Sequence, residues 1–438
     1  MRRDHGRVNR LRALRGRLRA VTFAGMLAAV AIAGWLVVRS TGDSPAPPGT
    51  AHVWIDPDGG SCARAANASA YSDAAACGTF TDALAAANDG DSILAVAGTY
   101  NAFTLDDRQD LTIAAAPDAE PVIVGDVRFQ GLNTARVTFR GFTVTDTAPA
   151  IGRVYVRHGT DLLLDDLHLD RAMFMARATE GLVIEDSFVE NGALWTDATA
   201  LGMFCGCGVW AGTYNDVPTT DITVRRNEFH NMAGDGVHLN DVTGGLVEDN
   251  YFERSQPFGT GDHVDVIQVV KGADITLRRN EARDWQHGIL TTDDAPQDGP
   301  DADSRAMIVE NNLIDAIAGY GLNGAFGPNS LVANNTVTGD EGNGVAIRWT
   351  VGSNPGTTTS DGMVFANNLV DGACSCDQLL TYVANHVELG FTFDAGFELP
   401  AGSEPVDAAQ PAYAPTLDMR SRPRFGSPDV GALERQGT

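Results

Sequence analysis

The sequence predicts an all-β fold, a right-handed parallel β-helix of about ten coils. The first observation is a short apolar run that ends in Asn and recurs through the second half of the chain. These runs end at Asn227, Asn250, Asn280, Asn312, Asn335 and Asn368, at intervals of 23, 30, 32, 23 and 33 residues. A repeat with a period in the twenties predicts a solenoid. The alternation inside each unit is typical of strands and not of helices.

A second sequence motif lies between the Asn turns and has the form X-Gly-apolar-X-apolar. It occurs at 207–211, 235–239, 287–291, 320–324 and 343–347, and 265–269 fits with Val in place of Gly. Each coil therefore has at least two short strands, and weaker coils continue upstream at 137–144, 162–169 and 182–189. We assign the Asn column to the fold, because Asn tolerates the left-handed backbone of a tight turn and can bond to the next Asn along a stack.

The N-terminus is strongly basic and precedes an apolar segment. Residues 1–20 hold eight Arg and one acid, and residues 21–38 hold no charge. Such a flank predicts a cytoplasmic N-terminus, and 18 apolar residues are just enough to span a bilayer. We favour an uncleaved anchor over a cleaved signal peptide. Residues 39–50 then form a Pro/Ser/Gly linker, and residues 51–438 form a β-helix domain outside the cytoplasm, either membrane-anchored or secreted.

Six cysteines agree with export, because an even number in an exported chain predicts disulfides. Cys62 and Cys77 would close a loop before the first helix. The two Cys-X-Cys pairs, Cys205 with Cys207 and Cys374 with Cys376, could bond locally or to each other, and a four-Cys metal site is the alternative.

The body is acidic. Residues 51–438 hold 22 of the 31 basic and 55 of the 57 acidic side chains, a net charge of −33. This balance excludes nucleic-acid binding through phosphates. Acidity favours solubility, and the alternative role is affinity for divalent cations. We expect a monomer.

One amphipathic helix is predicted at 79–88. Phe80, Ala83, Leu84 and Ala87 share one face, Thr79 can cap the helix, and Gly90 can end it. We expect this helix to cover the open end of the solenoid. At the other end, residues 429–434 close the chain.

These end pieces carry a resemblance. The stretch GTFTDALAAANDGDSILAVAGTY at 78–100 and the terminal PDVGALE are similar to the start and finish of secreted bacterial pectate-lyase-like β-helix proteins. The resemblance covers residues 52–434. It implies the fold and leaves the activity open, because that superfamily includes polysaccharide lyases, glycoside hydrolases, epimerases and non-catalytic surface proteins.

Alternation along the Gly-phase strands predicts two outward columns. His238 would align with Trp210, Gln268, Leu290, Asn323 and Ala346, and Asn240 with Gly212, Val270, Thr292, Ala325 and Arg348. An aromatic ring, amides and a guanidinium suit an extended sugar chain, with Trp210 as a stacking platform. His287 is a further candidate for substrate binding. The alternative is an ordinary solvated face.

The densest polar cluster is 262–271, which contains Asp262, His263, Asp265, Gln268 and Lys271. Lys271 is the only lysine of the chain. Lys shifts its pKa readily and can act as a base, whereas Arg stays protonated. Removing the proton next to a uronic carboxyl needs such a base, and a cation on the carboxyl would assist. The alternative is a simple solvent-facing turn.

The run 263–280 is similar to the catalytic stretch of the chondroitinase B and alginate lyase group, polysaccharide lyase family six. That pattern has acid-X-acid, a short apolar strand, Lys, and Asn nine residues later. The resemblance implies that Lys271 is the general base and Asp265 a calcium ligand. The chain departs from the pattern, because His263 replaces the first acid, Lys271 lies one residue farther on, and Thr292 stands at an Arg position. Arg348 and Arg279 are the candidate replacements for that Arg.

Three functions remain open. The first is a polysaccharide lyase acting on an acidic, uronic-acid glycan, with Lys271, His238 and Arg348 in catalysis and Asp265 holding Ca²⁺ with Asp262 or Asp235. The second is a glycoside hydrolase that uses the carboxylates of Asp293, Asp294 and Asp265. The third is a non-catalytic cell-surface protein that binds glycans. We favour the lyase.

Overall fold

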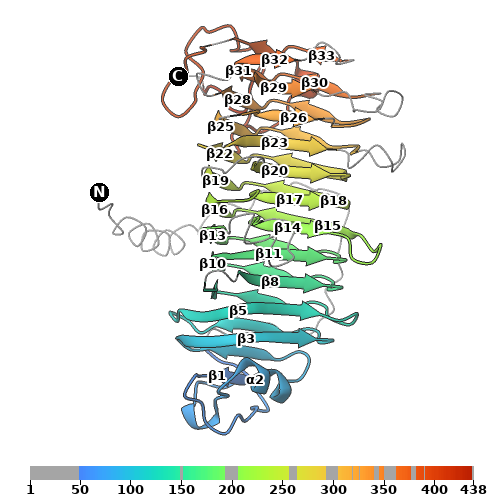
Figure 1. The fold of residues 1–438 in the computed structure, drawn as a ribbon. Helices are drawn as coiled ribbons and strands as arrows, with labels where there is room; N and C mark the ends of the chain where they lie inside the picture. The colour runs from blue at the N-terminus through green and yellow to red at the C-terminus, as the bar shows by residue number, and fades with distance from the viewer. Residues whose placement is uncertain are drawn as a thin grey trace. The chain divides into compact units, whose positions relative to one another are not determined.

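A computed structural model describes residues 49–147, 151–192, 206–255, 264–292, 304–317, 319–324, 326–339, 345–349, 362–375, 381–388 and 390–436. Its strands stack along one axis as a parallel β-helix (Figure 1). Every pairing between the named strands is parallel, from β1 with β2 to β31 with β34. The all-β fold predicted from the repeat phrases is confirmed.

Three strands of each central coil contribute to three faces, which we call sheets A, B and C. Sheet A has 13 strands. They are β1 (Val53–Ile55), β2 (Ser92–Ala95), β4 (Thr112–Ala115), β6 (Thr138–Arg140), β9 (Leu163–Asp165), β12 (Val183–Glu185), β15 (Thr219–Arg225), β18 (Val242–Glu248), β21 (Ala273–Arg278), β24 (Ile308–Glu310), β27 (Leu331–Ala333), β30 (Val364–Ala366) and β33 (Tyr382–Val383). Sheet A therefore has more strands than the roughly ten coils predicted, because the N-terminal coils carry neither of the two repeated motifs.

Sheets B and C are joined through the long strands β3 and β5. Sheet B contains β3 (Gly98–Asp106), β5 (Pro121–Gln130), β7 (Thr143–Thr145), β10 (His168–Asp170), β13 (Phe188–Glu190), β16 (Glu228–Met232), β19 (Tyr251–Ser255), β22 (Glu281–Arg283), β25 (Leu313–Ile317), β28 (Thr336–Gly339), β31 (Leu369–Asp371) and β34 (His386–Val387). Sheet C contains β8 (Gly152–Arg157), β11 (Ala172–Arg177), β14 (Val209–Gly212), β17 (Val237–Asn240), β20 (Asp265–Val270), β23 (His287–Thr292), β26 (Leu322–Gly324), β29 (Val345–Trp349) and β32 (Ala373–Ser375). The start of β5 pairs with β7 and its end pairs with β8.

The core follows the period-two alternation of the strands. In sheet A the buried stack is Ile184, Val224, Val247, Leu277, Val309, Val332 and Phe365, each at most 1% exposed. Sheet C contributes Val237, Leu239, Ile267 and Val269 in the same way. Burying one such aliphatic side chain stabilises the fold by roughly 1.5–3 kcal/mol, so the repeated stack supplies the main driving force.

The Asn column is a hydrogen-bonded ladder between sheets A and B. Each side-chain amide donates to the Oδ1 of the next Asn, at 3.1 Å from Asn227 to Asn250 and 3.0 Å from Asn250 to Asn280. The ladder continues through Asn312, Asn335 and Asn368 to Asn385. The left-handed backbone lies one residue earlier than expected, at Arg226, Asp249, Arg279, Asn311, Asn334 and Asn367. The assignment of this column to the fold is confirmed.

The N-terminal end is covered by α2 (Phe80–Ala86), somewhat shorter than the predicted helix. Thr79 caps it by accepting a hydrogen bond from the Asp82 amide at 3.1 Å. Phe80 is buried and stacks on Phe103 with ring centroids 4.4 Å apart, which attaches the cap to the first coils. A short 3-10 turn, η1 (Asp73–Ala75), precedes the helix.

The predicted disulfide between Cys62 and Cys77 is present. Cys207 is also disulfide-bonded, and the cysteines that the structure describes include no free thiol. Cys205 and Cys376 lie outside the described residues, as does the side chain of Cys374.

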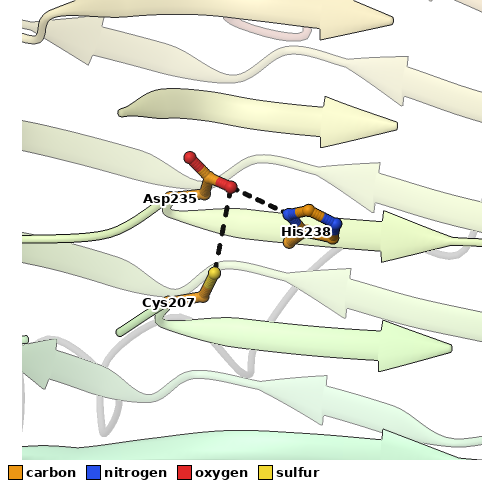
Figure 2. A group of neighbouring side chains, drawn as sticks. All are labelled: Cys207, Asp235 and His238. Carbon is orange, nitrogen blue, oxygen red and sulfur yellow. Dashed lines mark hydrogen bonds and ion pairs between the residues drawn. The ribbon is translucent and has the colours of Figure 1, made fainter. Parts of the chain in front are cut away.

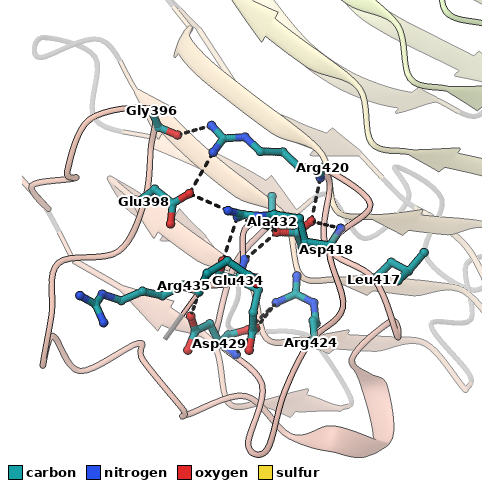
Figure 3. Close-up of polar contacts among 12 residues, drawn as sticks. Gly396, Glu398, Leu417, Asp418, Arg420, Arg424, Asp429, Ala432, Glu434 and Arg435 are labelled. Carbon is teal, nitrogen blue, oxygen red and sulfur yellow. Dashed lines mark hydrogen bonds and ion pairs between the residues drawn. The ribbon is translucent and has the colours of Figure 1, made fainter. Parts of the chain in front are cut away.

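The C-terminal segment 390–436, which includes η3 (Pro411–Tyr413), lies against the side of the last coils and not only at their end. The amide of Asn334 donates to the carbonyls of Asp429 and Gly431, and that of Asn311 donates to the carbonyl of Leu417. Within the segment, Arg424 and Glu434 form a buried ion pair at 3.1 Å (Figure 3). The terminal sequence therefore covers the last coils by packing on the turns beside the Asn ladder.

The apolar segment 21–38 lies outside the described residues. Among the helices that the structure describes, none is long and apolar enough to cross a membrane.

Candidate functional site

The outer face of sheet C carries the predicted column largely in register. Trp210, His238, Gln268, Leu290 and Asn323 occupy successive partner positions on β14, β17, β20, β23 and β26. In the second column, Asn240 aligns with Val270 and Val270 with Thr292, as predicted, while Ala325 lies outside the described residues.

The register at β29 corrects the sequence prediction. Arg348, and not Ala346, is the partner of Asn323, so Arg348 belongs to the His238 column. The shift is two residues long. Because strand side chains alternate with a period of two, such a slip keeps the same face outward and is invisible to alternation.

Trp210 is not an exposed platform for sugar stacking. It is only 4% exposed and packs with Met173 and Met175, while the guanidinium carbon of Arg177 lies 5.0 Å from its ring centroid. Gln268 and Leu290 are also buried, at 8% and 7% exposure, whereas Asn240 and Asn323 are half-buried. The expected open stripe is thus a largely covered surface, in which few groups reach solvent.

Asp235 and His238 form the clearest chemical pair on this face (Figure 2). Asp235 lies in the turn before β17, and its Oδ2 is 2.9 Å from His238 Nδ1. Its other oxygen accepts the backbone N–H of Asp265 at 2.8 Å, which fixes the carboxylate from the next coil. The Asp235 side chain is 7% exposed and that of His238 15%.

This geometry sets the state of the imidazole. A carboxylate at Nδ1 favours the tautomer whose proton lies on that nitrogen. In the neutral ring, Nε2 is then an acceptor. It makes no hydrogen bond to the residues that the structure describes. Nε2 is therefore the ring nitrogen that a ligand on this face would meet.

The same cluster does not fit the expected calcium site. Ca²⁺ takes six to eight oxygen ligands, but both oxygens of Asp235 are engaged, and the third neighbour is Cys207 Sγ at 3.8 Å from Oδ2. Because Cys207 is disulfide-bonded, its sulfur has no proton to donate and no thiolate to offer a metal. Asp265 is buried at 1% exposure, and Asp262 lies outside the described residues.

A second acidic group lies far from this face, where sheet A meets its turn. It contains Asp165, Glu185 and Asp186. Glu185 and Asp186 are already paired with Arg226 at 2.6 and 2.9 Å. Burial and the neighbouring carboxylates, Glu185 first, raise the pKa of Asp165 to about 6. This group is a charged part of the solenoid wall and not part of the candidate site.

Lys271 and Asp265 lie at opposite ends of β20. Lys271 occupies the turn after the strand, with φ 54° and a half-buried side chain. Six residues of extended strand separate the two Cα atoms by roughly 20 Å. The fold therefore does not bring Lys271 next to the carboxylates of Asp235 and Asp265.

His287 begins β23, and its Nδ1 accepts the backbone N–H of Tyr320 at 3.1 Å while the two rings stack 5.6 Å apart. His287 thus joins neighbouring coils. Asp293, Asp294 and His263 lie outside the described residues, and of Arg348 only the backbone is described.

Sequence reasoning missed a group of arginines on the N-terminal half of the same face. Arg128, Arg153, Arg157 and Arg177 are half-buried on β5, β8 and β11. Arg128 and Arg153 share Asp126, at 2.7 and 2.5 Å. The alternation Arg153-Val-Tyr-Val-Arg157 was the available signal, since it predicts two arginines on one face of a strand.

The sequence matches the family described as "Right handed beta helix region" over residues 175–378. Together with the parallel three-sheet topology, this match decides the fold. The protein is a right-handed β-helix protein. No curated protein matches its sequence.

Several solved structures are similar to this right-handed β-helix protein. Pectate lyase Pel9A is 15% identical, with 88% of this chain and 96% of that chain covered and a TM-score of 0.43. The PL6 family alginate lyase AlyGC is 14% identical, with 74% and 54% covered and a TM-score of 0.36. The A-module of the Azotobacter vinelandii mannuronan C-5 epimerase AlgE4 is 14% identical, with 68% and 88% covered and a TM-score of 0.32. Similarities at this level say nothing of the activity of this chain.

Proposed function

We propose that this protein is an exported, carbohydrate-active β-helix protein that cleaves an acidic, uronic-acid polysaccharide by β-elimination. The observation that carries the proposal is the Asp235–His238 pair, whose Nε2 is unbonded among the described residues, on the face that also bears the arginines. The protein acts as a monomer outside the cytoplasm, and residues 21–38 attach it to the membrane or direct its secretion.

His238 supplies the base. Nε2 removes the proton on the carbon next to the uronic carboxyl, and the electrons of that C–H bond form the C=C bond. The bond from the neighbouring carbon to the glycosidic oxygen breaks, and this oxygen takes a proton from water. The carboxylate of Asp235 stabilises the imidazolium that forms, in the manner of an oriented acid–base pair.

The arginines bind the polymer. The body as a whole is acidic, so an anionic glycan needs a local positive surface. Among the described residues, Arg128, Arg153 and Arg157 outnumber the carboxylate of Asp126, which pairs with the first two. Guanidinium groups match carboxylates in shape and form strong, charge-assisted hydrogen bonds.

We propose His238 in place of Lys271 as the base, because Asp235 Oδ2 lies 2.9 Å from its Nδ1 and orients the ring. The variants His238→Ala and Lys271→Ala distinguish these two assignments of the base. We would incubate the protein with alginate, pectate, chondroitin, dermatan and heparin, with Ca²⁺ or with EDTA, and follow the ultraviolet absorbance of unsaturated uronates. We expect one polymer to give a signal that falls about 10²- to 10⁴-fold in His238→Ala and persists in Lys271→Ala.

Other outcomes point to other functions. Loss of the signal in Lys271→Ala alone would return the role of base to Lys271. New reducing ends without the absorbance would indicate a hydrolase using Asp293, Asp294 or Asp265. Binding without either product would indicate a non-catalytic glycan-binding protein, and a signal that requires Ca²⁺ would show that ligands beyond the described residues take part.

A further inference from the structure

We infer that Arg157, with Gln130 and Tyr214, forms a binding site for a sugar carboxylate several coils away from the Asp235–His238 pair. The inference rests on the proposed function and specifies the length of glycan that the protein recognises. Its consequence is that the protein binds long acidic oligosaccharides more tightly than short ones.

Arg157 is held on the outer face of sheet C by hydrogen bonds to two neutral side chains from other coils. Its Nη2 donates to Gln130 Oε1 at 3.0 Å, and its Nη1 donates to the Tyr214 hydroxyl at 3.3 Å. The guanidinium carbon also lies 5.1 Å from the centroid of the Tyr214 ring. Tyr214 follows β14, so it reaches back past β11 to contact β8. The guanidinium is therefore held in one position by β5, β8 and the turn after β14.

The positive charge of Arg157 has no counter-charge among the described residues. No described carboxylate lies within ion-pair distance of it, in contrast to Arg128 and Arg153, which both pair with Asp126. Its Nε is buried and has no hydrogen-bond partner among the described atoms. A half-buried charge without a partner is costly, and an anionic ligand removes that cost. A planar, fixed guanidinium selects a carboxylate.

The position of Arg157 sets the length of the ligand. Strand β8 is three strands from β17 in sheet C, through β11 and β14. At about 4.8 Å per strand, Arg157 and His238 are roughly 14 Å apart across the sheet. A disaccharide held at His238 is too short to reach Arg157, whereas a hexasaccharide that follows the coils reaches both.

Titration calorimetry measures how the affinity depends on oligosaccharide length, and it does so without any cleavage of the ligand. We would use the full chain carrying His238→Ala, with the disaccharides and hexasaccharides of galacturonate and of mannuronate as probes. Adding Arg157→Ala should weaken hexasaccharide binding about 10- to 100-fold and leave disaccharide binding unchanged. Arg157→Lys should restore part of the loss, because it keeps the charge without the planar fork.

Arg136→Ala is the matched control. Arg136 is exposed and paired with Asp110 on a turn, so its removal should change neither affinity. Thermal unfolding of each variant confirms that the fold is kept. An equal loss for both lengths, no loss for either, or no hexasaccharide binding at all would overturn the inference. Absence of cleavage with length-dependent binding would instead overturn only the proposed lyase activity.

Discussion

Two rows of polar side chains run across the coils of this protein, and they differ in how completely they are hydrogen-bonded. In the Asn ladder, the amide of Asn280 donates to Val247 O and to Asn312 Oδ1, and its own Oδ1 accepts from Asn250. On the outer face of sheet C, His238 Nε2 makes no hydrogen bond among the described residues, and the Arg157 guanidinium has only neutral partners among them.

The difference separates polar groups that stabilise the fold from polar groups that can act on a ligand. A buried amide whose donors and acceptors are all bonded contributes to stability and has nothing left to offer. A side chain that is oriented on one side and open on the other retains a free donor or acceptor. The repeated pattern in the sequence marks the first row, while only three-dimensional contacts identify the second.

The largest expected effect is on the ladder. Asn280→Ala should lower the free energy of unfolding by about 3–4 kcal/mol, because the buried N–H of Asn250 loses its acceptor and the side-chain bonds to Val247 O and Asn312 Oδ1 are lost. Urea unfolding followed by circular dichroism measures this. The exposed Asn101 of β3 is the control, and Asn101→Ala should change stability by about 0.5 kcal/mol or less. Equal effects at the two positions would show that the hydrogen bonds of the ladder add nothing to stability.

A smaller effect is expected at the pair on sheet C. Asp235→Asn should lower the cleavage rate about 10- to 100-fold, because an amide no longer stabilises the imidazolium or fixes the proton on Nδ1. Initial rates on the polymer that is cleaved provide the measurement. Asp241→Asn makes the same change of charge on an exposed turn nearby and should leave the rate unchanged. Equal rates in the two variants would show that the pair has no part in the reaction.

The smallest expected effect is on the pH dependence of stability. It concerns a third row, the charged side chains at the C-terminal ends of the sheet A strands. Most neighbours along it have opposite charge, such as Arg225 with Glu185, but Asp165 faces Glu185 directly. Burial and this repulsion raise the pKa of Asp165 to about 6, above its ordinary value of 3.8. The folded state therefore holds this proton more tightly than the unfolded state, and stability should fall as pH rises from about 4 to 6.

Asp165→Asn should remove that slope and stabilise the protein by about 1 kcal/mol at neutral pH, since solvent screens part of the repulsion. Urea unfolding at pH 4, 5, 6 and 7 measures it. Arg136, paired on another turn, offers a comparison, because Arg136→Gln should leave the slope between pH 5 and 7 unchanged, where its partner Asp110, with its lowered pKa, stays ionised. An unchanged slope in Asp165→Asn would show that the repulsion is already relieved.

The solenoid, its core and the Asn ladder could be predicted from the amino-acid sequence alone. All three follow from two patterns that repeat at short range, the apolar alternation and the Asn interval. The end helix followed from its own amphipathic pattern and the cap at Thr79. Repetition makes each coil an independent test of the same prediction, so a local pattern is sufficient. The disulfide between Cys62 and Cys77 followed from export and proximity in sequence.

The folded structure, and no sequence pattern, defines the candidate site. It paired Asp235 with His238, placed Lys271 at the far end of β20 from Asp265, and gathered arginines from β5, β8 and β11 on one face. It also buries Trp210 and places Arg348 two residues away from its predicted register. Alternation tells which side of a strand a residue faces, but loop lengths set which residues of different coils meet and which of them are covered.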